Sequence, residues 1–116
     1  MNFEKYDITQ GKIMIAFSDK NLSVGTLELK PGQELEKHNR PALESLYQLD
    51  GKCIMKIFKG SSIEKEITLN EGDSIDIEPE KYHMHTNPFD KKSITLWKAS
   101  GDITEIINSI RKNSRL

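Results

Sequence analysis

Residues 32–51 read GQELEKHNRPALESLYQLDG, and residues 72–87 read GDSIDIEPEKYHMHTN. These two stretches hold all three histidines of the chain. In an extended segment, side chains two residues apart lie on the same face. The polar side chains that would share a face in this way are His38 with Arg40, Glu44 with Gln48, and His83 with His85. We therefore expect three segments, distant in sequence, to bring polar side chains into one interior.

Glycine and proline divide the rest of the chain into short runs with alternating, often β-branched residues. These runs are residues 12–17, 22–29, 43–49, 52–58, 63–69, 74–77, 82–86 and 93–98. Short strands separated by regular turns are typical of an all-β sandwich or barrel. Asp50-Gly51 and Gly60-Ser61 predict two hairpin turns, because glycine adopts the positive φ values that tight turns need.

The C-terminal region predicts the one helix of the chain. Its isoleucines follow the spacing of a single helical face and are Ile103, Ile106, Ile107 and Ile110. Asp102 can cap the first turn with its carboxylate. We expect this short helix to cover an apolar face or an open end of the barrel.

Composition bounds the class of protein. The 116 residues carry 17 basic and 18 acidic side chains, which gives a net charge of −1. We therefore expect no nucleic-acid partner, because such a partner is usually bound through a basic surface. No apolar run is long enough to cross a membrane, and the N-terminus does not resemble a secretory signal. Cys53 is the only cysteine and reads as a small core residue. We expect a cytoplasmic protein with a single domain over residues 1–116.

Both quoted stretches resemble the two motifs of the cupin superfamily. The first motif, G-x5-H-x-H-x3-E-x6-G, is matched in every spacing, with arginine in place of its second histidine. The matching residues are Gly32, His38, Arg40, Glu44 and Gly51. The second motif, G-x5-P-x-G-x2-H-x3-N, is matched in spacing but has glutamate where the family prefers proline and glycine. Its positions are Gly72, Glu78, Glu80, His83 and Asn87.

This resemblance implies a small antiparallel β-barrel of jelly-roll type, with the motif residues facing its interior. It also implies a metal site, because in cupins these positions hold iron, manganese, nickel or zinc. Carried over by residue, the ligands are His38, Glu44 and His83. By the same resemblance we expect a homodimer.

Arg40 leaves three interpretations open, because a guanidinium has no lone pair to give a metal. In the first, His38, Glu44 and His83 bind the metal while Arg40 orients an anionic substrate. In the second, His85 supplies the missing imidazole. In the third, Arg40 pairs with Glu44 and the barrel holds an organic ligand without metal.

Arg40, Gln48 and His85 are the candidate substrate-binding residues. Gln48 could equally satisfy a neighbouring backbone group, and His85 could be an interior histidine with its own partner. The leading hypothesis is a small-molecule-binding cupin, with a metal-dependent activity of oxygenase or isomerase type on a small anionic compound. The alternative is a metal-free ligand-binding or sensor protein without catalysis.

Overall fold

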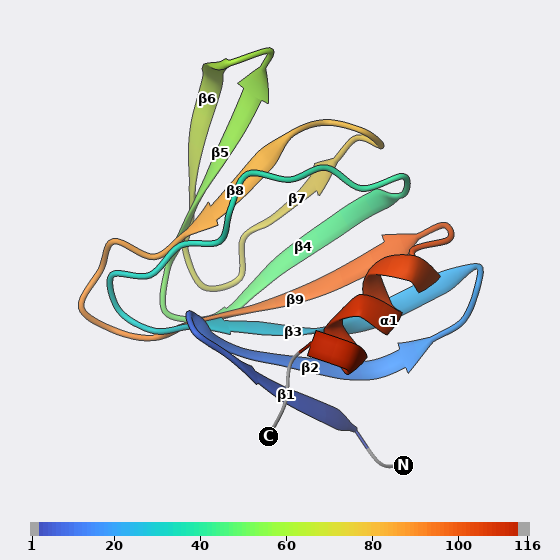
Figure 1. The fold of residues 1–116 in the computed structure, drawn as a ribbon. Coiled ribbons are helices and arrows are strands. Elements are labelled where there is room, and N and C mark those ends of the chain that lie inside the picture. Colours follow the sequence, from blue (N-terminus) through green and yellow to red (C-terminus); the bar gives the residue numbers. More distant parts are fainter. Residues whose placement is uncertain (1–2, 114–116) are drawn as a thin grey trace.

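The computed structural model describes residues 3–113, which form nine strands and one helix. In chain order they are β1 (Glu4–Ile8), β2 (Gly11–Ser18), β3 (Leu22–Leu29), β4 (Leu43–Asp50), β5 (Cys53–Lys59), β6 (Ser62–Leu69), β7 (Ser74–Ile77), β8 (His83–Thr86), β9 (Ser93–Ser100) and α1 (Thr104–Asn113). One sheet has the order β1-β2-β3-β9-β4-β7 and the other β6-β5-β8, with every pairing antiparallel. This arrangement (Figure 1) confirms the predicted all-β jelly roll with a short C-terminal helix.

All eight expected strands are present, and their ends differ from the predicted ones by at most two residues. The structure adds β1, which pairs with β2 along its whole length. This edge strand alternates half-buried and exposed side chains, with Tyr6 and Ile8 on its half-buried side. Its alternation is weak as a sequence signal because charged residues fill most of the other positions.

The hairpin predicted at Asp50-Gly51 is wrong. β4 pairs with β9 and β7, whereas β5 pairs with β6 and β8, so this turn carries the chain from one sheet to the other. Gly51 does adopt a positive φ of 67°, and a Cβ there would lie 2.3 Å from the carbonyl oxygen of Lys92. Glycine is therefore needed here because it lets two chain segments pass close to each other at a corner of the barrel.

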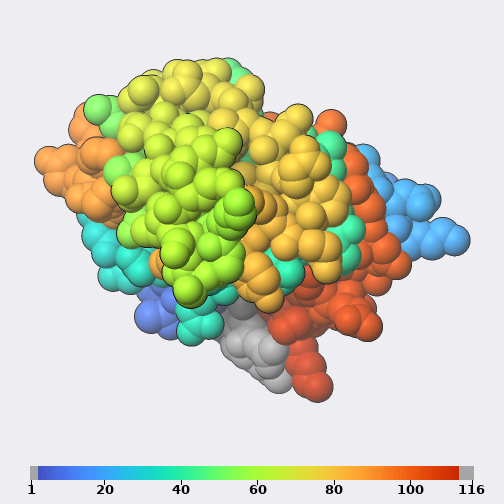
Figure 2. All heavy atoms as spheres, turned by 90° about the horizontal axis from the view of Figure 1, so that it is seen from above, coloured from blue at the N-terminus to red at the C-terminus, as the bar shows by residue number. Residues whose placement is uncertain are grey.

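The hairpin predicted at Gly60-Ser61 is confirmed, because β5 and β6 pair up to Lys59 and Ser62. This hairpin projects from one end of the molecule (Figure 1), and it covers much of the near face in the view from above (Figure 2).

Two apolar clusters hold the fold together. The first lies between the sheets and contains Leu46 and Ile77 from the larger sheet and Met55, Ile57 and Leu69 from the smaller one. Cys53 belongs to this cluster and is fully buried, which raises the pKa of its thiol to about 11. It is thus a core residue, as predicted.

The second cluster lies under α1, which crosses one face of the larger sheet (Figure 1). Ile103 and Ile107 are buried there, and Ile106 and Ile110 pack beside them. Asp102 caps the helix by accepting hydrogen bonds from the backbone N–H and hydroxyl of Thr104. The predicted helix therefore covers an apolar face. None of the described residues forms a helix with the length and hydropathy needed to cross a membrane.

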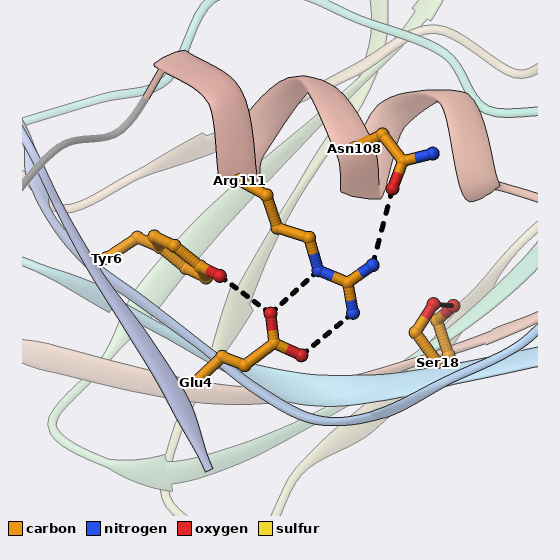
Figure 3. A network of polar contacts seen from close by, with 6 residues as sticks. Glu4, Tyr6, Ser18, Asn108 and Arg111 are labelled. Carbon is orange, nitrogen blue, oxygen red and sulfur yellow. Dashed lines mark hydrogen bonds and ion pairs between the residues drawn. The ribbon is translucent and has the colours of Figure 1, made fainter.

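A polar contact ties α1 to the N-terminal strand (Figure 3). Arg111 donates two hydrogen bonds to the carboxylate of Glu4, at 2.7 and 2.8 Å, and Tyr6 donates a third at 2.6 Å. These bonds keep the pKa of Glu4 below its ordinary value, with the bond from Arg111 the largest cause. The helix is thus fixed to the barrel by apolar packing and by a charged contact near its end.

Candidate metal centre and adjoining pocket

The three histidines meet in the interior of the barrel. His38 lies in the segment before β4 and pairs with His83 through two backbone hydrogen bonds of 3.0 and 2.8 Å. His83 and His85 share the inward face of β8, where their side chains are 0% and 4% exposed. One ligand nitrogen of each imidazole lies within 4.8 Å of those of the other two. The segments expected to converge therefore do so.

Backbone carbonyls orient two of the rings. Nδ1 of His38 lies 2.8 Å from the carbonyl oxygen of Glu36, and Nδ1 of His83 lies 2.9 Å from that of Lys81. Because a carbonyl can only accept, each Nδ1 carries a proton, and in the neutral ring this leaves the lone pair on Nε2. Metal-binding histidines are commonly held by such a second hydrogen bond.

Three buried atoms in this region have no hydrogen-bond partner within the protein: Nε2 of His83, Nδ1 of His85 and Oε1 of Glu44. The first and third of these lie 3.4 Å apart, which is longer than a well-formed hydrogen bond. A buried polar atom without a partner costs about 1–3 kcal/mol. Three together, all able to donate a lone pair, form a donor set that fits a cation.

Burial and neighbouring charges set the protonation states. Burial, then the charges of Arg40 and His83, lowers the pKa of His38 to about 4. Burial, then His38 and His83, lowers the pKa of His85 to about 3. For Glu44 burial works to raise the pKa, but the contact with His83 and the surrounding positive charges lower it. At neutral pH His38 and His85 are thus neutral and the carboxyl is ionised, the forms that bind metals.

Arg40 lies beside this cluster but does not pair with Glu44. Its Nη1 donates to the carbonyl oxygen of Asn39 at 3.1 Å, and among the described residues it joins no ion pair. Glu44 contacts His83 instead. The pairing on which the third interpretation depends is therefore absent. Burial lowers the pKa of Arg40, with Glu44 opposing that shift.

A pocket of about 80 Å³ extends from the cluster toward α1. One end is polar and is lined by His38, Arg40, Glu44 and His85. The rest is apolar: Ile13, Leu27, Trp97 and Ala99 come from the larger sheet, Leu35 from the segment before β4, Ile103 from the residue before α1, and Ile106, Ile107 and Ile110 from α1 itself. The apolar part of the pocket therefore lies between the larger sheet and α1, and the polar residues line its other end.

Of the six predicted site residues, the structure brings five together: His38, Arg40, Glu44, His83 and His85. Gln48 is not among the residues that line the pocket. It is fully buried, its Nε2 donates to Asp50 O and Ser93 Oγ, and its Oε1 accepts from Thr95. The structural role left open for Gln48 is the one observed. Asn87 has a similar role, since its Nδ2 donates to three backbone carbonyls.

The sequence did not predict that apolar residues of the larger sheet and of α1 would line the pocket. The isoleucines near the C-terminus were predicted to cover an apolar face, which is correct, and Trp97 packs against both apolar clusters. The signal for a wall was the concentration of β-branched residues on one helix face, but only the fold places that face opposite the polar cluster.

No protein-family profile and no curated protein matches the sequence. Solved structures do resemble it. An RmlC-like cupin of Shewanella frigidimarina gives a TM-score of 0.77 at 19% identity, covering 90% of this chain and 89% of that one. The Cnp3 cupin domain of Schizosaccharomyces pombe gives 0.72 at 14% identity, covering 94% and 74%.

Oxalate decarboxylase of Bacillus subtilis, an enzyme with Mn(II) centres, gives a TM-score of 0.75 at 24% identity. The match covers 85% of this chain but 28% of the decarboxylase chain. Taken with the two-sheet topology and the inward-facing motif residues, these likenesses show that the chain has the fold of an RmlC-like cupin.

Proposed function

We propose that this chain is a small-molecule-binding cupin that holds one divalent first-row metal ion at His38, His83 and His85, with Glu44 beside them. The observation that carries the proposal is the group of buried, unpartnered donor atoms from His83, His85 and Glu44. Imidazole nitrogen and carboxylate oxygen suit iron, manganese, nickel and zinc. This set combines the ligands implied by the cupin motif with the imidazole of His85.

Protonation and orientation support the same proposal. The lowered pKa values of His38 and His85 keep their lone pairs available at neutral pH. The carbonyls of Glu36 and Lys81 hold the rings of His38 and His83 with Nε2 directed away from the backbone bond. A site whose ligands are already oriented loses less entropy on binding an ion.

A metal at this position would act as a Lewis acid on an oxygen atom of the bound compound. The protein would do the rest: Arg40 would hold negative charge through its planar fork, and the isoleucine wall would exclude water from the same pocket. The likeness to a decarboxylase with Mn(II) centres, whose name identifies a small dicarboxylate, supports a small anionic compound.

Metal binding can be tested on purified protein stripped with chelator and then titrated with Mn(II), Zn(II), Fe(II) or Ni(II) by calorimetry. We expect about one ion per chain, and a loss of affinity of at least about tenfold in His38→Ala, His83→Ala and His85→Ala. Glu34→Gln is the matched control, because Glu34 is an exposed acid in the same segment as His38. Equal metal affinity in the wild type and a triple histidine variant would contradict the proposal.

Arg40 favours one alternative, a metal-free ligand-binding or sensor protein. Its positive charge beside the cluster opposes a cation and can hold an anion unaided. If none of the four metals binds after chelator treatment, and small anions still bind, this alternative replaces the metal site.

A further inference from the structure

The pocket beside the histidine cluster has two chemically different ends. Arg40 is the one permanently positive side chain that lines it, and it lies with the imidazoles at the polar end. No charged residue lines the part of the pocket between the sheet and α1. A ligand that fills the pocket must therefore carry its charge at one end only.

Arg40 is suited to bind the charged end. A guanidinium has five N–H donors, and this one donates a single hydrogen bond, to the carbonyl of Asn39. It is half-buried and no carboxylate of the described residues pairs with it. The planar fork matches the two oxygens of a carboxylate, and such charge-assisted bonds are stronger where water is partly excluded. Glu44 adds a negative charge at this end, which a bound cation would balance.

The remainder of the pocket is suited to an aliphatic chain. Ile106 and Ile110 project from α1 on one side, and Leu27 and Trp97 lie on the sheet side. A second carboxylate placed there would lose its water and gain no partner, which costs far more than the burial of a methylene gains. A volume of about 80 Å³ admits roughly five to eight non-hydrogen atoms, taking 10–15 Å³ for each water-sized group.

We infer that the compound bound here is a short-chain monocarboxylate, with its carboxylate on Arg40 and its aliphatic chain between Trp97 and the isoleucines of α1. This inference rests on the proposed binding of a small anion and adds the class of that anion. It gives α1 a role in specificity, because isoleucines of the helix would contact the aliphatic part of the ligand.

The chain carries its own reporter, since Trp97 is its only tryptophan and lines the pocket. Tryptophan fluorescence can be titrated with acetate, butanoate, hexanoate and octanoate, with succinate and 1-butanol as controls. We expect affinity to rise about fourfold for each added CH₂, from ~0.8 kcal/mol per buried methylene, and to stop rising beyond hexanoate. Succinate and 1-butanol should bind more weakly than butanoate.

Two variants assign the ends of the ligand. Arg40→Gln should lower the affinity for butanoate by about tenfold or more, to a value close to the affinity for 1-butanol. Ile106→Gln should remove most of the dependence on chain length while leaving acetate unchanged. Glu105→Gln, an exposed neighbour on the same helix, is the control. Affinity that does not depend on chain length in the wild type, or tighter binding of succinate than butanoate, would overturn the inference whatever the variants do.

The titrations are made on metal-loaded and on chelator-treated protein, so the two proposals fail separately. Binding that depends on chain length, by a protein that takes up none of the four metals, supports this inference and contradicts the metal site. Stoichiometric metal binding, with no preference for longer monocarboxylates, supports the metal site and contradicts this inference.

Discussion

Arg40 stands where the cupin motif has its second histidine, and its charge determines how strongly the cluster can hold a cation. Two unit charges 4 Å apart interact by about 1 kcal/mol in water and by about 4 kcal/mol near a protein surface, so a guanidinium beside the cluster opposes a cation by an amount of this order. The partly buried position of Arg40 makes the true penalty larger. Arginine at this position thus exchanges metal affinity for the ability to hold an anion.

Replacement of this residue separates the two contributions of charge and ligand. Arg40→Gln removes the charge, so we expect the affinity for Zn(II) or Mn(II) to rise by about tenfold. Arg40→His removes the charge and also adds an imidazole at the motif position, so its affinity should rise further. Calorimetry on the two variants and the wild type makes the comparison. If Arg40→His binds metal no more tightly than Arg40→Gln, the side chain at position 40 does not reach the ion.

The spacing of the two motifs predicted which side chains would share a face, because alternation in a strand fixes their faces regardless of the rest of the fold. Alternation places His83 and His85 on one face, whereas the meeting of His38, Glu44 and His83 was implied by the resemblance to the cupin motifs. The partners of His85 and Gln48 do not follow from either, since a buried polar residue looks the same in sequence whether it faces a cavity or a packed backbone. Thr95 and Ser93, which satisfy Gln48, come from a strand 45 or more residues away.

The elements show a similar division. Short alternating runs predicted eight strands, and the spacing of the isoleucines predicted α1. Which strands pair depends on long-range contacts, so Asp50-Gly51 could be recognised as a turn but not as a crossing between sheets. The same turn chemistry serves both uses, because each needs only a glycine with positive φ.

The contact of Arg111 with Glu4 fixes α1, the proposed specificity wall, to β1 (Figure 3). Both side chains are more than a third exposed, so we expect Glu4→Gln to cost only about 0.5–1 kcal/mol of unfolding free energy at pH 7. The folded state lowers the pKa of Glu4, so this stabilisation is complete above the ordinary value of 4.5 and is lost as the pH falls through the lower folded value. The stability difference between wild type and variant should therefore shrink as the pH falls below 4.5.

Urea unfolding at a series of pH values measures that difference directly. Glu105→Gln is the control, because Glu105 is an exposed acid in the first turn of the same helix. A gap between wild type and Glu4→Gln that stays constant down to pH 3 would show that the contact contributes nothing through its charge.

At the scale of the whole molecule, the outer face of the larger sheet carries exposed apolar side chains on neighbouring strands. Tyr47 on β4 lies directly opposite Leu96 on β9, and Phe17 on β2 lies opposite Val24 on β3. Tyr47 and Phe17 are 42% and 48% exposed, so both leave much of an aromatic ring in contact with solvent. Apolar side chains gathered on one sheet face are typical of an interface, and a two-fold axis would place each patch on its copy.

We therefore propose that the expected homodimer forms through this face, and that Tyr47→Lys disrupts it by placing two like charges at the contact. Light scattering coupled to size exclusion should give about twice the chain mass of 13.3 kDa for the wild type and the single mass for Tyr47→Lys. Tyr82→Lys is the matched control: Tyr82 is 47% exposed but lies just before β8, next to the smaller sheet, so its replacement should leave the dimer intact. A wild-type monomer at all concentrations would exclude the dimer, and a dimer that survives Tyr47→Lys but not Tyr82→Lys would move the interface to the smaller sheet.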